Sequence, residues 1–151
     1  MIWIISLNSS LGHIYSYEPK KHQLKLLETL ENPAGKLKTS DLISDAPGHY
    51  KTSHSTKGAY EWPSDPHDVE VDRFTKNLAS LLKKGLDEHR FSQLILCAAP
   101  HVGGVLLNNL DKQVEQVLLT NIKKNFVEAD TSVLTDYLKY NWWEIIRSNK
   151  I

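Results

Sequence analysis

The apolar positions at the start of the chain follow the periods of β-strands. Residues 2–7 form a nearly continuous run of Ile, Trp and Leu that ends at a polar cluster, which is typical of a strand buried on both faces. Residues 13–17 alternate as a half-buried strand does. Residues 24–30 are apolar with intervening charges and fit either a strand or a short helix. The two closely spaced strands before them favour a three-stranded meander.

Helical spacing replaces this pattern after the middle of the chain. Ser64-Asp65-Pro66 combines an N-cap candidate with a first-turn proline, and Gly85 follows two lysines as a stop signal. The pattern predicts a long helix between these points, with its acidic residues near the favourable end of the macrodipole. We expect its apolar stripe to be core rather than a groove for a partner: Val71, Phe74, Leu78, Leu81 and Leu82.

The next strongest apolar run is residues 91–99, a candidate central strand stopped by Pro100. We expect a turn over residues 101–104, a short helix over 105–110, and another helical turn that starts at Asp111. A helix followed by a buried strand is typical of an α/β fold, in which helices cover a sheet.

The last third of the chain predicts one more strand and one or two helices. Residues 117–122 read as a strand, and residues 130–132 can cap an amphipathic helix over 133–140. The tail, residues 141–151, contains Trp142-Trp143 and is expected to add further helix. Without internal repeats or low-complexity segments, residues 1–151 are expected to form a single domain.

A stretch without either period, about residues 44–64, separates the meander from the long helix. Inserts of this length in compact domains are usually functional or disordered. No acid lies between Asp45 and Glu61, so the stretch is basic and rich in rings. Such a mixture resembles single-stranded RNA sites; the alternative is a solubilising surface loop. The candidate binding residues are His49, Tyr50, Lys51, His54, Lys57, Gly58 and Tyr60.

Charge limits that interpretation in two ways. The chain has 18 Lys and Arg against 18 Asp and Glu, and zero net charge argues against a protein that coats nucleic acid. The acidic start of the long helix, with Asp68, Glu70 and Asp72, is expected to repel a phosphate backbone near the loop. An RNA site would therefore be local.

Composition also restricts the compartment and the cofactors. The single Cys97 excludes an internal disulfide and a multi-cysteine metal site, so a reducing cytoplasm is the default. The apolar start is too short for a membrane span and lacks the basic residues of a signal peptide. We expect a soluble cytoplasmic protein without membrane contact.

The residue types with catalytic chemistry are poorly arranged for it. His49, His54 and His67 lack metal-site spacing, and Cys97 reads as a small buried residue. His101 follows the central strand, where ligands gather in α/β sheets, although a surface turn is the alternative. The Gly103-Gly104 pair beside it suggests either a phosphate cradle or close packing of a helix on the sheet. We therefore expect no cofactor, no metal and no catalytic residue.

Several segments together resemble a known family. They are WII, HIY, LENP, DLISDAPG, SDPHDVEVDRFTKNLASLL and FSQLILCAAPHVGGVLLNNL, in this order over residues 2 to about 140. The chain is similar to the bacterial host-attachment proteins, which are described as required for attachment to host cells. That family resembles the central domain of archaeal and eukaryotic class-one release factors and of Pelota. The resemblance implies an RNase H-like α/β fold with a mixed sheet of about five strands.

In release factors the loop before the long helix carries a Gly-Gly-Gln motif that reaches the ribosome's peptidyl-transferase centre. The matching place here has Lys57-Gly58-Ala59, so peptide release by that motif is not expected. We expect a non-enzymatic binding protein that acts on ribosomes or RNA through the loop, with an indirect role in host attachment. The alternatives are a hydrolase of RNA or peptidyl-tRNA, and a module for self-association or a protein partner through Trp142 and Trp143.

Overall fold

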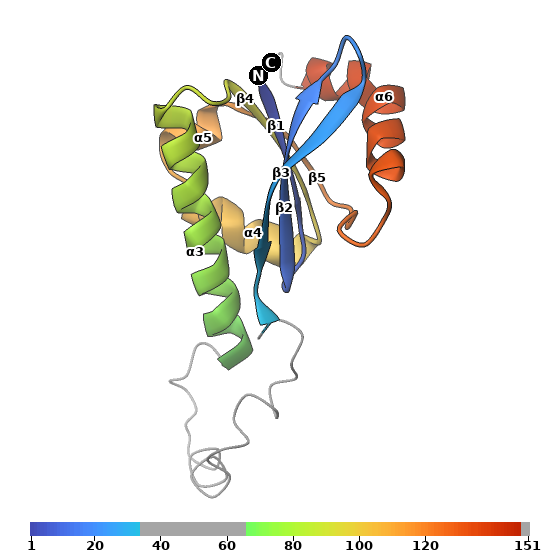
Figure 1. Cartoon of the computed structure of the whole chain (residues 1–151). Helices are drawn as coiled ribbons and strands as arrows, with labels where there is room; N and C mark the ends of the chain where they lie inside the picture. The colour runs from blue at the N-terminus through green and yellow to red at the C-terminus, as the bar shows by residue number, and fades with distance from the viewer. Residues whose placement is uncertain (34–65, 149–151) are drawn as a thin grey trace, which may run out of the picture.

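The computed structural model describes residues 1–33 and 66–148, which form a mixed sheet between two layers of helices (Figure 1). The five strands lie in the order β3-β2-β1-β4-β5. β2 is antiparallel to β1 and β3, whereas β4 and β5 run parallel to β1. The expected meander is confirmed, and residues 24–30 are strand rather than helix. The strand bounds are Ile2–Leu7, Leu11–Glu18, Gln23–Glu31, Gln93–Ala98 and Leu118–Ile122, for β1 to β5.

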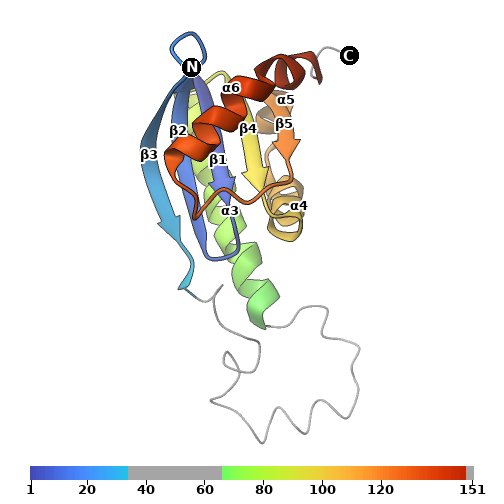
Figure 2. The same ribbon diagram turned by 90° about the vertical axis from the view of Figure 1, so that its right-hand side faces the viewer.

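The helices cover the two faces of the sheet unequally (Figure 2). α3 (Pro66–Asp87), α4 (Pro100–Asn109) and α5 (Lys112–Gln116) lie on one face. On the other face, α6 (Thr131–Ser148) is the one covering helix among the residues that the structure describes, and it includes part of the expected helical tail. This strand order, with β2 antiparallel to its neighbours, is that of the RNase H-like fold, as the family resemblance implied.

Alternation along β1 divides the core between the two faces. Trp3 and Ile5 point to the α3 face, and Ile2 and Ile4 point to the α6 face. Because every residue of β1 is buried, this strand occupies the centre of the sheet as its apolar run predicted. The residues that α3 contributes to its core include four members of the predicted stripe: Val71, Phe74, Leu78 and Leu82.

Gly85 is not the end of the long helix, contrary to the expectation. α3 continues to Asp87 and closes with a Schellman arrangement, in which Arg90 N donates to Gly85 O at 2.8 Å and His89 N donates to Leu86 O at 3.0 Å. His89 has the left-handed φ of 60° that this ending requires. Gly85 instead allows close packing, because a Cβ there would lie 2.9 Å from a ring carbon of Trp3.

The expected turn at residues 101–104 is also wrong, because α4 begins directly at Pro100. Proline suits the first helical turn, whose N–H groups have no partner within the helix. A Cβ on Gly103 would lie 3.1 Å from that of Ala98, so this glycine lets α4 approach β4 closely. The predicted turn at Asp111 is confirmed: its side chain accepts a hydrogen bond from Gln113 N at the start of α5.

Within the described residues, every helix is too short or too polar to cross a membrane.

Candidate functional site

β1 and β4 end side by side at one end of the sheet, where Leu7 pairs with Ala98. β3 also ends there, and both α3 and α4 begin there (Figure 1). Residues 34–65 are therefore joined to the described fold at this end on both sides. We call it the loop-bearing end and define it by residues 8–10, Asn32 and the first turns of α3 and α4. In open α/β sheets, ligands bind outside the carboxyl ends of the strands.

Asn32 holds the chain at the point where it leaves the sheet. Its backbone N–H donates to Ser10 O at 2.8 Å, and its side-chain Nδ2 donates to Ser9 O at 2.9 Å. The residue is only 7% exposed, so these bonds are largely shielded from water. One stem of the 34–65 segment is therefore anchored to the turn between β1 and β2.

Asn8 stabilises that same turn rather than offering a free ligand. Its Oδ1 accepts hydrogen bonds from Ser10 N and Leu11 N, both at 2.8 Å, and from Ser10 Oγ at 3.1 Å. An RNase H-like nuclease needs a carboxylate on its first strand, whereas β1 here carries none and the turn-forming amide of Asn8 follows it. Elsewhere in residues 1–33 and 66–148, no three His, Cys, Asp or Glu side chains are placed to hold a metal ion.

His101 connects the starts of the two helices at the loop-bearing end. It lies in the first turn of α4, and its Nε2 is 3.7 Å from Oδ1 of Asp68 in the first turn of α3. Both side chains are substantially exposed, and such pairs contribute little to stability. His101 is thus at the expected edge of the sheet and accessible there.

The acidic start of α3 is compensated by bases of the same helix. Glu70 lies 3.1 Å from Arg73, and Asp72 lies 2.9 Å from Lys76. These i,i+3 and i,i+4 spacings are those at which helical side chains meet. The expected repulsion of phosphate is therefore reduced, because the bases lie within contact distance of these acids.

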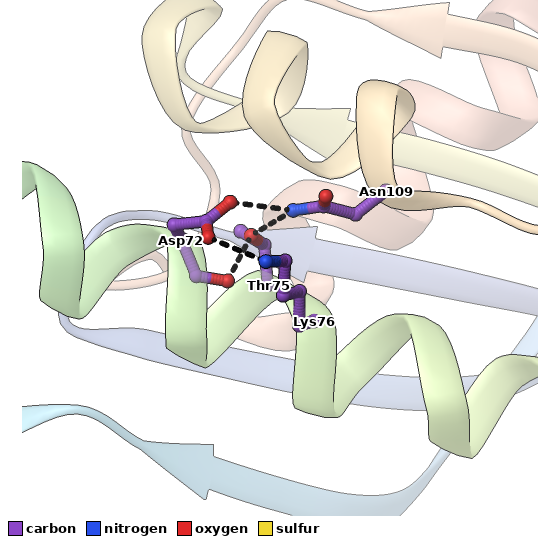
Figure 3. Close-up of polar contacts among 4 residues, drawn as sticks. All are labelled: Asp72, Thr75, Lys76 and Asn109. Carbon is purple, nitrogen blue, oxygen red and sulfur yellow. Dashed lines mark hydrogen bonds and ion pairs between the residues drawn. The ribbon is translucent and has the colours of Figure 1, made fainter. Parts of the chain in front are cut away.

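Asp72 also joins a hydrogen-bonded cluster that ties α3 to the end of α4 (Figure 3). Asn109 Nδ2 donates to Asp72 Oδ1 at 3.1 Å and to Thr75 Oγ1 at 2.9 Å, and Thr75 Oγ1 donates to Asp72 O at 3.0 Å. The hydrogen bond from Lys76, followed by that from Asn109, lowers the pKa of the Asp72 carboxyl. The Asp72–Lys76 spacing is visible in sequence, but nothing local indicates that Asn109 reaches this helix.

The one cysteine is unsuited to nucleophilic chemistry, as predicted. Cys97 is fully buried in β4, and burial raises the pKa of its thiol to about 12. Ser6 lies opposite it on β1 and is also buried. The Ser6 hydroxyl has no hydrogen-bond partner among the described residues, and no base within reach activates it.

An open groove of about 690 Å³ runs along the later half of α3, away from its start. Lys83 reaches across it, with Nζ 2.7 Å from Asp87 Oδ1 and 2.7 Å from Gln113 Oε1. The groove is open and its walls carry lysines and acids together, whereas pockets for small molecules are enclosed. We therefore do not assign a ligand to it.

The two tail tryptophans have different surroundings. Trp142 is half-buried, with its ring centroid 5.4 Å from that of Tyr17 on β2. Trp143 is 76% exposed, and Tyr140 beside it on α6 is 78% exposed. Only Trp143 of the pair is presented for contact with a partner.

Most of the predicted binding residues lie outside the described residues. The structure places only His101 of that set; the others are His49, Tyr50, Lys51, His54, Lys57, Gly58 and Tyr60. The structure does show the residues that flank their segment. Asn32 lies at one stem, and Asp68 and His101 lie at the other.

Three solved structures match most of this chain at low sequence identity. An archaeal protein shares 12% identity with a TM-score of 0.51 over 99% of this chain and 36% of its own. Dom34 of S. cerevisiae, a translation termination-like factor involved in RNA quality control, shares 11% with a TM-score of 0.46 over 99% and 38%. A non-polymerisable pCBH ParM mutant shares 13% with a TM-score of 0.47 over 94% and 46%. This chain thus spans less than half the length of each.

The search of curated proteins gave no match. A family model, by contrast, covers most of the chain, from residue 3 to residue 138. It includes all of the sheet except Ile2, α3 to α5 and the start of α6, and it stops before Trp142 and Trp143. The chain therefore belongs to the family described as protein required for attachment to host cells.

Proposed function

We propose that this protein is a non-enzymatic RNA-binding protein of the cytoplasm, which contacts ribosomal or other RNA through the basic segment at residues 47–62. Its part in host attachment is then indirect. The observation that carries the proposal is the placing of both stems of this segment at the carboxyl ends of β1 and β4. The segment between these stems contains Lys51, Lys57 and several rings in its sequence, and α/β proteins bind ligands at the carboxyl ends of their strands.

The charged groups at the loop-bearing end support the same proposal. Glu70 and Asp72 are paired with Arg73 and Lys76, so the start of α3 opposes an approaching phosphate chain less than its sequence suggests. His101 stands exposed next to Asp68 at the same end of the sheet and can add a hydrogen-bond donor.

The test is co-sedimentation with purified ribosomes and with single-stranded RNA. We expect Lys51→Ala/Lys57→Ala to weaken binding by about tenfold or more, and to reduce the slope of log affinity against log salt by about two. Lys20→Ala/Lys21→Ala is the matched control, because it removes the same charge from the β2–β3 turn at the opposite end of the sheet (Figure 1).

Wild-type protein that fails to sediment with either RNA at low salt would refute the proposal. Equal weakening by both double variants would also refute it, because binding would then follow net charge and not the segment.

A further inference from the structure

β3 is one outer edge of the sheet, and its outward side faces no described element (Figure 2). Leu26 is 50% exposed and Leu27 is 38% exposed on this strand. An edge strand presents unpaired backbone N–H and C=O groups, which a strand of another molecule can pair with. The question is whether its side chains favour a particular partner.

A bulge at Leu27 decides which way the side chains of β3 point. Ile14 of β2 pairs with Glu28, whereas the next residue, Tyr15, pairs with Leu26, so Leu27 is the extra residue. Ile14 belongs to the α3 face and Tyr15 to the α6 face. Because opposed residues share a face, the side chains of β3 form two sets. The α3-face set is Gln23, Lys25, Glu28 and Leu30, and the α6-face set is Leu24, Leu26, Thr29 and Glu31.

The bulge therefore puts one base and one acid of β3 on the same face. Lys25 and Glu28 are three residues apart, a spacing that points to opposite faces in a regular strand. Both are exposed, and neither forms an ion pair with another residue in the described ranges.

We propose that two copies of this chain associate through β3, antiparallel, about a two-fold axis that passes between Leu26 and Leu27. This register sets Lys25 of each copy opposite Glu28 of the other and Leu26 opposite Leu27. Leu24 meets Thr29, so side chains outside the bulge keep their own face, and the two sheets become one ten-stranded sheet.

Charge selects this register and this partner. Charges on an edge strand usually prevent pairing, but here two-fold symmetry brings a base to an acid twice. A shifted register that also keeps side chains of the same face opposite each other sets Lys25 opposite Leu30. That register forms neither of the two Lys25–Glu28 pairs. Opposed charges of unlike sign stabilise strand pairs, and like charges destabilise them.

The test is sedimentation equilibrium of the full chain over a dilution series. We expect a dimer whose dissociation constant rises with salt, because exposed ion pairs are screened. Glu28→Lys should raise the dissociation constant about tenfold or more, since it places two like-charged pairs at the interface. The double variant Lys25→Glu/Glu28→Lys exchanges the charges and should restore dimerisation. Circular dichroism checks that each variant is folded.

Trp143→Ala is the control, because it removes an exposed ring from α6 and not from β3. It should leave the dimer unchanged. If Trp143→Ala dissociates the dimer, the two copies associate through α6, and the proposal is overturned. A wild-type monomer at every concentration, or a double variant no better than Glu28→Lys, would overturn it as well.

Discussion

The two faces of the sheet are built differently, although both are buried. On one face, three helices pack on the sheet and are joined to each other by polar contacts, of which Asn109 to Asp72 and Thr75 is the clearest. On the other face, α6 is the one helix within residues 1–33 and 66–148, and the core beneath it includes several aromatic rings. The first face includes both helices that begin at the loop-bearing end. The difference suggests that the α3 face positions that end, while α6 mainly seals the sheet.

Substitutions that leave a cavity in the core should have the largest effects on stability. They also show whether the two faces of the sheet unfold together. Leu82 on α3 and Leu138 on α6 are both completely buried. We expect Leu82→Ala and Leu138→Ala each to reduce the free energy of unfolding by about 3 kcal/mol, as lost burial plus a cavity requires. Urea unfolding followed by circular dichroism measures both.

Val133→Ala is the control for this pair, because Val133 is 48% exposed on α6 and should lose far less stability. A loss for Leu138→Ala as small as that of the control would mean that the α6 layer is not part of one cooperative core.

Removing a buried hydroxyl group should have opposite effects on stability at the two faces. Thr75 on the α3 face donates and accepts hydrogen bonds, whereas the hydroxyl of Ser6 has no described partner. By strand alternation, Ser6 lies on the α6 face with Ile4. We expect Thr75→Val to cost about 1 kcal/mol and Ser6→Ala to gain about 1 kcal/mol, since an unpaired buried hydroxyl is unfavourable.

Thermal unfolding of both variants measures this contrast. A loss of stability in Ser6→Ala would show that the hydroxyl makes a bond that the described contacts lack.

The smallest effect concerns pH and the cluster at Asp72. Bonds from Lys76 and Asn109 lower the pKa of this carboxyl in the folded protein. Its contribution to stability is therefore present above the unfolded pKa, about 3.9, and is lost as pH falls through the folded pKa. We expect Asp72→Asn to be slightly less stable than wild type at neutral pH.

That deficit should disappear in acid, where wild-type Asp72 is protonated too. Unfolding curves at pH 7 and at about pH 2 test the difference. A deficit of equal size at both values would show that the ionised carboxylate is not what stabilises the cluster.

Much of the fold was predictable because its signals are local. The buried run of β1, the stripe of α3 and the short apolar run of β4 each identified an element of the right type. The errors occurred where a local signal had a non-local cause. Gly85 looked like a helix stop, and it is a glycine because the Trp3 ring packs against it. Gly103 looked like part of a turn, and it allows α4 to approach Ala98.

The candidate site was predictable only in part, for the same reason. The position of His101 after a strand could be inferred from sequence, because chain order determines which strand end it follows. Its nearness to Asp68, the bonds of Asn32 to the β1–β2 turn, and the contact of Asn109 with Thr75 depend on how elements pack. Residue types alone do not encode these distances.

The sequence by itself determined the α/β class and the position of a basic segment between β3 and α3, because periodicity and composition act over a few neighbouring residues. The family followed from the match of whole segments over residues 3–138. Only the tertiary structure decided that both stems of that segment meet at the carboxyl ends of β1 and β4. It also decided that the acids of α3 are compensated, and that a bulge turns Lys25 and Glu28 to one face. These features follow from strand pairing and helix packing, which join residues that are distant in the chain.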